Sequence, residues 1–73
     1  MKHAINKELS SEEINRAIES WINGRNAKRD REIMKLRLID GLTFEQLAEK
    51  VDMSTRGVVK IVYKWLDVLS RHL

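Results

Sequence analysis

Cysteine and proline are both absent from this 73-residue chain, and glycine occurs only three times. Without cysteine, the chain can form neither disulfide bonds nor metal–thiolate sites. Without proline, and with few glycines, little interrupts long helices, and the abundant Leu, Ile, Lys, Arg and Glu residues favour them. A chain this short is expected to form one domain with a thin core, whose stability depends on helix packing, helix caps or a partner subunit.

Long apolar runs are also missing from the sequence. No stretch approaches the ~20 apolar residues that a membrane-spanning helix needs, and the first residues lack the apolar segment of a signal peptide. We therefore expect a soluble, cytoplasmic protein. No set of nucleophile, base and orienting acid is evident, so we expect no enzymatic activity and no cofactor. His3 and His72 are isolated near the termini, so no metal site is expected.

Positive charge is concentrated in the later part of the chain. The net charge is +3, but residues 1–24 hold three basic and four acidic side chains, whereas residues 25–73 hold eleven and seven. A basic region of this kind favours a polyanionic partner, although +3 is also ordinary for a soluble protein.

Helix-capping signals divide the chain into an N-terminal tail, residues 1–9, and one all-α domain of four helices, residues 10–73. Ser10 and Glu13 have the spacing of a capping box, which places the first helix start at Ser10. The apolar stripe that follows at helical spacing includes Trp21, so this side chain is expected in the core.

The second helix is expected between two glycine-containing stops. Asn23-Gly24 favours a left-handed end to the first helix. Asn26 is positioned to cap the second helix, which is expected to run to about Asp40. Its apolar residues cover more than one side, which predicts a helix packed centrally between the others.

Capping residues also mark the last two helices. Thr43 and Gln46 have the spacing of another capping box, which starts a short helix of about eight residues. Ser54 is positioned to cap the fourth helix, which is expected to extend to His72.

The connection between the third and fourth helices is the most informative segment. Only residues 52–54 separate the two, and so short a turn favours a steep crossing. Ala48 supplies the small side chain that such a crossing requires. Met53 in the turn, followed by Val58 and Ile61 three residues apart, completes the apolar pattern of a helix-turn-helix.

The segments REIMKLR (31–37), DGLTFEQLA (40–48), MS (53–54) and VVKI (58–61) resemble region four of bacterial sigma factors. They are also similar to the DNA-binding domain of response-regulator transcription factors, over residues 29–69. The resemblance implies a last helix that enters the DNA major groove and, as in sigma factors, contact with RNA polymerase. Asp52 replaces the usual glycine of the turn, and aspartate tolerates the left-handed conformation.

The resemblance also assigns candidate DNA-binding residues. Thr43, at a helix N-terminus, would let backbone amides meet a phosphate, and Tyr63 and Lys64 would contact the flanking backbone. The family's base-reading residues are not reproduced, so its promoter specificity is not carried over. An ordinary solvated helix face is the alternative for the basic side chains. The positions expected to face base edges are Thr55, Arg56, Val59 and Lys60.

A second basic face lies on the second helix. Lys28, Arg31 and Lys35 line up at helical spacing and are candidate phosphate contacts. The alternative is that they are solubilising charges paired with Asp30 and Glu32.

These patterns predict sequence-specific binding of double-stranded DNA by a small transcription regulator. The alternative is a protein-interaction module that binds RNA polymerase or another regulator. Binding to RNA is disfavoured because exposed aromatic residues for base stacking are few.

A homodimer through the C-terminal helix is a further expectation, because one helix-turn-helix reads only a few base pairs. Apolar residues cover more of this helix than one core face requires. The alternative is that Trp65 and Leu69 pack within one monomer. The residues of the predicted interface are Trp65, Leu66, Val68, Leu69 and Leu73.

Overall fold

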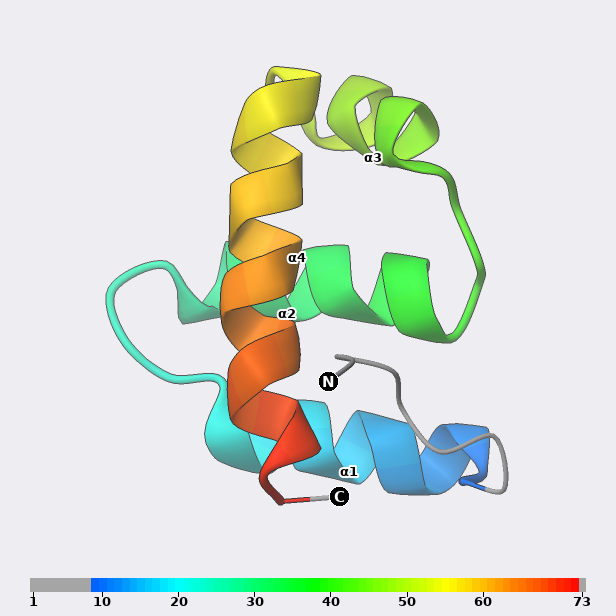
Figure 1. Cartoon of the computed structure of the whole chain (residues 1–73), viewed down its shortest axis with the longest axis vertical. Coiled ribbons are helices and arrows are strands. Elements are labelled where there is room, and N and C mark those ends of the chain that lie inside the picture. The colour runs from blue at the N-terminus through cyan, green and yellow to red at the C-terminus, as the bar shows by residue number, and fades with distance from the viewer. Residues whose placement is uncertain (1–8, 73) are drawn as a thin grey trace.

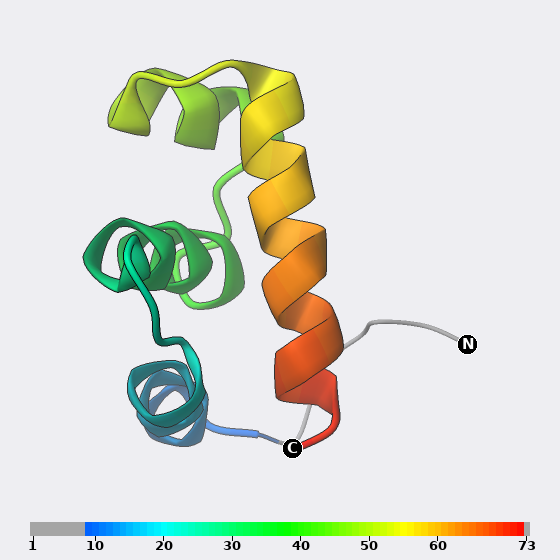
Figure 2. The ribbon, with the colours of Figure 1, turned by 90° about the vertical axis from the view of Figure 1, so that its left-hand side faces the viewer.

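The computed structural model describes residues 9–72, and within that range it contains four α-helices and no strand (Figure 1). Three helices are stacked one above another, and the fourth runs along the stack (Figure 2). The predicted all-α, four-helix fold is confirmed. Among the described helices, none is long and apolar enough to cross a membrane. The helices are α1 (Ser11–Trp21), α2 (Ala27–Leu38), α3 (Phe44–Val51) and α4 (Thr55–Ser70).

Capping boxes start α1 and α3, as predicted. In α3, the Gln46 amide donates to the Thr43 hydroxyl at 3.1 Å, and the Gln46 side chain accepts from the Thr43 amide at 2.9 Å. Ser10 and Glu13 form the equivalent box before α1. Asn26 occupies the N-cap position of α2, as predicted, but its side chain makes no capping hydrogen bond.

Three helices end earlier than predicted, at Trp21, Leu38 and Ser70. After α2, Gly41 adopts a φ of 75° and the Leu42 amide donates back to the Leu36 carbonyl at 3.1 Å, so the chain has already turned. After α4, the last amides donate to carbonyls only three residues back, which closes the helix before His72.

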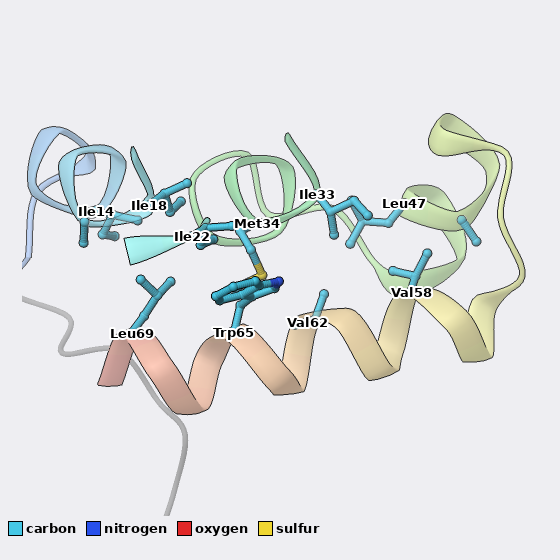
Figure 3. Packing of buried hydrophobic residues seen from close by; sticks show 12 residues of the cluster. Ile14, Ile18, Ile22, Ile33, Met34, Leu47, Val58, Val62, Trp65 and Leu69 are labelled. Carbon is cyan, nitrogen blue, oxygen red and sulfur yellow. The ribbon is translucent and has the colours of Figure 1, made fainter. Parts of the chain in front are cut away.

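The core lies between α4 and the helix stack (Figure 3). α2 and α4 each contact all three other helices, whereas α1 and α3 share no contact within the described range. The predicted central packing of α2 is confirmed. The largest fully buried side chains are Ile18, Ile22, Ile33, Met34, Leu47, Leu69, Val58 and Val62.

One polar contact joins α2 to α4 inside this core. Trp65 is buried within the monomer, and its indole N–H donates to Asp30 Oδ2 at 2.9 Å. The other oxygen of this buried carboxylate accepts from Arg29 Nε at 3.1 Å. A buried carboxylate needs such partners, because an unpaired charge in the core is strongly unfavourable.

Trp21 does not lie in the core, which corrects the sequence-based expectation. Its side chain is 43% exposed and stacks on His72, with ring centroids 3.6 Å apart and planes within 4°. Ile18 and Ile22, four residues apart, are fully buried. They fill the space beside α4, and Trp21 is left at the edge of the apolar stripe.

Candidate nucleic-acid interface

The turn between α3 and α4 sets the direction in which α4 leaves α3. Asp52 adopts a left-handed conformation (φ 58°, ψ 51°), so aspartate replaces glycine here without loss of the turn. The amides of Asp52 and Met53 both donate to the Ala48 carbonyl. Ala48 itself is buried. The predicted tight turn between α3 and α4 is therefore present, and the small side chain of Ala48 is buried beside it.

The outer face of α4 carries the side chains that sequence analysis assigned to DNA. It lies opposite the core face of α4, whose side chains point into the stack (Figure 3). Arg56 and Lys60 are exposed, and neither makes an ion pair with any residue from 9 to 72. Val59 is half-buried beside them. Thr55 is exposed as the first residue of α4, but it lies seven residues before the buried Val62 and so on the core side of the helix. The structure therefore brings Arg56, Val59 and Lys60 together and places Thr55 apart from them at the helix start.

Lys64 and Tyr63 are exposed but make contacts with other parts of the protein. Lys64 Nζ lies 4.8 Å from the centroid of the Trp65 ring, a cation–π arrangement. Tyr63 is 51% exposed, and its ring lies 6.1 Å from that of Phe44 at the start of α3. These contacts restrain the positions of both side chains beside the outer face of α4.

Arg37 is a contributor to this region that sequence analysis missed. Its guanidinium lies 4.3 Å from the centroid of the Phe44 ring and donates to the Leu42 carbonyl at 2.8 Å. With the Phe44–Tyr63 contact, it links α2, α3 and α4. No periodic pattern could reveal it, because Arg37 and Phe44 are on different helices and meet across a loop.

Thr43 has a more limited role than its position suggests. Its hydroxyl accepts from the Gln46 amide, so one lone pair is occupied by the cap. The hydroxyl hydrogen can still be donated to a phosphate. Glu45 and Glu49 are exposed on the same helix, and their charges disfavour close approach of α3 to a DNA backbone over its whole length.

Lys28, Arg31 and Lys35 share a face and line one pocket with Glu19 and Glu32, as their spacing predicts, but two of the three are already engaged. Lys35 Nζ lies 2.5 Å from Glu19 Oε2 on α1. Arg31 Nε donates to the Ile22 carbonyl at 2.9 Å, and its Nη1 lies 3.9 Å from Glu19. The acidic partner is thus Glu19, not Asp30 or Glu32. Only Lys28 has no ion pair among the described residues.

The Glu19 carboxylate is affected electrostatically by this arrangement. The hydrogen bond and the positive charge of Lys35 lower the pKa of Glu19 below its usual value of 4.5, and the charge of Arg31 adds to the effect. Partial desolvation acts in the opposite direction. Lys35 and Arg31 are therefore engaged in holding α1 against α2.

No group of three metal-ligating side chains occurs within residues 9–72; His3 lies outside this range. Compared with known protein families, curated proteins and solved structures, the chain matches none of them. The resemblance to sigma region four therefore stays a prediction carried by the quoted motifs.

Proposed function

We propose that this protein binds double-stranded DNA through the outer face of α4, with α3 and α4 acting as a helix-turn-helix. One observation carries the proposal. Arg56 and Lys60 lie one helical turn apart, exposed and without ion pairs among the described residues, on the end of α4 that the tight turn holds. Unpaired cations on a rigid helix match the negative potential of a DNA groove.

The dimensions of α4 suit this role. A helix with its side chains is about 10–12 Å across, and the major groove is about 12 Å wide. In this position Arg56 is able to bind a guanine edge, and the Val59 side chain is able to contact a thymine methyl group. Tyr63, Lys64 and the Thr43 hydroxyl would contact phosphates on either side.

Transcription regulation is the biological role we propose, from the resemblance to sigma region four. The competing role is a module that binds RNA polymerase or another protein. Salt dependence separates the two, because a DNA complex that neutralises phosphates weakens steeply as salt rises. Retention on heparin or duplex DNA that is insensitive to salt would favour the protein-binding role.

The direct test begins with selection of binding sites from random duplex DNA. The selected site is then used to compare Arg56→Ala and Lys60→Ala with the wild type by fluorescence anisotropy. If Arg56 reads a guanine, its loss weakens binding by ~1–3 kcal/mol and relaxes specificity at one base pair. Arg16→Ala is the matched control, because Arg16 is an exposed cation of α1 that makes no ion pair with residues 9–72.

The outcome that contradicts the proposal is equally specific. If Arg56→Ala and Lys60→Ala bind DNA as the wild type does, with unchanged circular dichroism, the outer face of α4 is not the DNA interface. If Arg16→Ala weakens binding as much as they do, the effect is general electrostatics and no face is assigned.

A homodimer through the C-terminal helix is still proposed, but with fewer interface residues than the sequence predicted. Trp65 and Leu69 are buried within the monomer, so they are not available to a second copy as the sequence suggested. Leu66 and Val68 remain partly exposed, and Leu73 lies outside the described residues. Sedimentation equilibrium tests the dimer: a mass that stays at that of one chain, with and without DNA, rules it out.

A further inference from the structure

A basic groove lies between the start of α2 and the end of α3. It has a volume of about 460 Å³ and is lined by the α1–α2 connection, α2 and α3, with no residue of α4. We call it the α2–α3 groove. Because it belongs to the helix stack, it lies apart from the outer face of α4, which points away from that stack (Figures 2 and 3). Its charged lining residues are Arg25, Lys28, Arg29, Lys50 and Glu32.

The cations of this groove are largely uncommitted. Arg25, Lys28 and Lys50 are exposed and make no ion pair with any residue from 9 to 72. Arg29 contacts Asp30 through Nε, which leaves the two terminal nitrogens of its guanidinium to donate elsewhere. Four positive side chains therefore face one groove against a single carboxylate, that of Glu32.

The lining chemistry fits phosphate groups better than an acidic peptide. Protein-binding sites depend on buried aromatic or large apolar anchors, and Val51 is the only apolar side chain among the described residues that line the groove. Phosphate contacts come mainly from arginine, lysine and small polar side chains. Asn26, whose side chain caps no helix, adds a donor of this kind.

We propose that the α2–α3 groove binds the phosphate backbone of a second DNA segment, separate from the one on α4. The inference rests on the proposed DNA binding by α4. Two separate phosphate-binding surfaces would let one copy of the protein hold two duplexes, or two parts of one bent duplex. Lys28, one of the predicted phosphate contacts, acts in this groove together with Lys50 instead of with Arg31 and Lys35.

The test is a titration of the ¹⁵N-labelled full chain with a short duplex of its selected sequence, followed by NMR. As DNA is added, α4 amides shift first. With duplex in excess, the amides of residues 25–29 and 50–51 shift in a second step. Shifts in α4 alone overturn the groove and leave the proposed function standing. Shifts in the groove alone overturn the α4 interface instead, and no shifts at all overturn both.

Variants separate direct contact from an indirect effect of binding at α4. In Lys28→Gln/Lys50→Gln, the second step is lost or its salt slope falls by about one for each lysine removed, while the α4 shifts persist. Arg16→Gln, which removes an exposed cation outside both surfaces, leaves both steps unchanged. A second step that survives in the double variant with its salt slope intact overturns the groove as a phosphate site.

Discussion

The two helix pairs of this protein share one apolar core but differ in the polar contacts that join their helices. In α1–α2, charged side chains cross between the helices: Glu19 pairs with Lys35, and Arg31 donates to the Ile22 carbonyl. In α3–α4, the fully buried Leu47 packs in the core and the turn amides converge on the Ala48 carbonyl. The first pair thus uses Lys35 and Arg31 for structure, whereas the second leaves Arg56 and Lys60 exposed.

This difference shows why a basic helix face is weak evidence for a DNA interface until its partners are known. Lys35 and Lys60 are both lysines on the polar side of a helix. Lys35 is held by a carboxylate of α1, whereas Lys60 makes no ion pair within the described range. A lysine already paired loses that pairing when it binds a phosphate, so Lys60 is the better candidate for DNA.

The largest expected change in stability comes from a substitution in the α3–α4 pair. Ala48→Leu adds volume where α3 meets the turn, and overpacking of this kind destabilises a fold by ~1–3 kcal/mol. The loss should be insensitive to salt, because no charge is involved. Denaturant unfolding measures it, with the exposed Glu49→Leu as control, expected within ~0.5 kcal/mol of the wild type. An unchanged midpoint for Ala48→Leu would mean that the contact is not tight.

The next effect concerns the polar contact that joins the two pairs through α2 and α4. Asp30→Ala leaves the buried indole N–H of Trp65 without an acceptor, which destabilises by about 1–2 kcal/mol. Asp30→Asn is the control, because its amide oxygen still accepts from the indole. If both variants unfold at the same denaturant concentration, the Trp65–Asp30 hydrogen bond contributes nothing measurable.

The sequence predicted those features that depend on local spacing. Capping boxes placed the starts of α1 and α3, and the short turn with Ala48 was recognised because capping and apolar periodicity act within a few residues. Helix ends were less well placed. They depend on where Gly41 turns the chain and on closer hydrogen bonds after α4.

Contacts between distant segments could not be predicted. Lys35 meets Glu19, and Lys50 joins the cations of residues 25–29, only because α2 packs between α1 and α3. Periodicity showed that Lys28, Arg31 and Lys35 share a face, but not that α1 neutralises two of them. Trp21 was misplaced for a related reason, since Ile22 beyond the helix end fills the core.

A smaller, stabilising effect is expected at the start of α4. Gly57 occupies the position that Glu13 and Gln46 hold in α1 and α3, where a side chain is accommodated beside the capping hydroxyl. A Cβ at Gly57 would lie 3.1 Å from Ser54 Oγ, so the Ser54 side chain must shift by a few tenths of an ångström to admit it. Gly57→Ala should therefore stabilise by about 0.5–1 kcal/mol, the helix-propensity difference.

Thermal unfolding compares this variant with Gly41→Ala. A Cβ at Gly41 would meet nothing within 4 Å, but its φ of 75° disfavours alanine. Gly41→Ala should therefore destabilise, although it has more space. If Gly57→Ala also lowers the thermal unfolding midpoint, the Ser54 side chain cannot shift to admit a Cβ. The start of α4 would then need glycine for packing.

The smallest effect is expected for the ionic contact of α1–α2, and it tests whether that pair depends on charge at all. Glu19→Gln removes the carboxylate that faces Lys35. Because the folded state lowers the pKa of Glu19 below 4.5, its contribution is present above that pH and is lost as the pH falls through the lowered value. The variant and the wild type should therefore differ slightly at pH 7 and converge at an acidic pH below the lowered pKa, where the carboxylate is protonated. They should also converge in about 1 M salt, where the screening length falls to about 3 Å.

Unfolding midpoints at the two pH values and two salt concentrations measure this, with Glu49→Gln as the control carboxylate that has no ion pair among the described residues. A difference that persists at low pH or in high salt would mean that hydrogen bonding or packing, rather than charge, holds α1 on α2, and the contrast with α3–α4 would then be one of geometry alone.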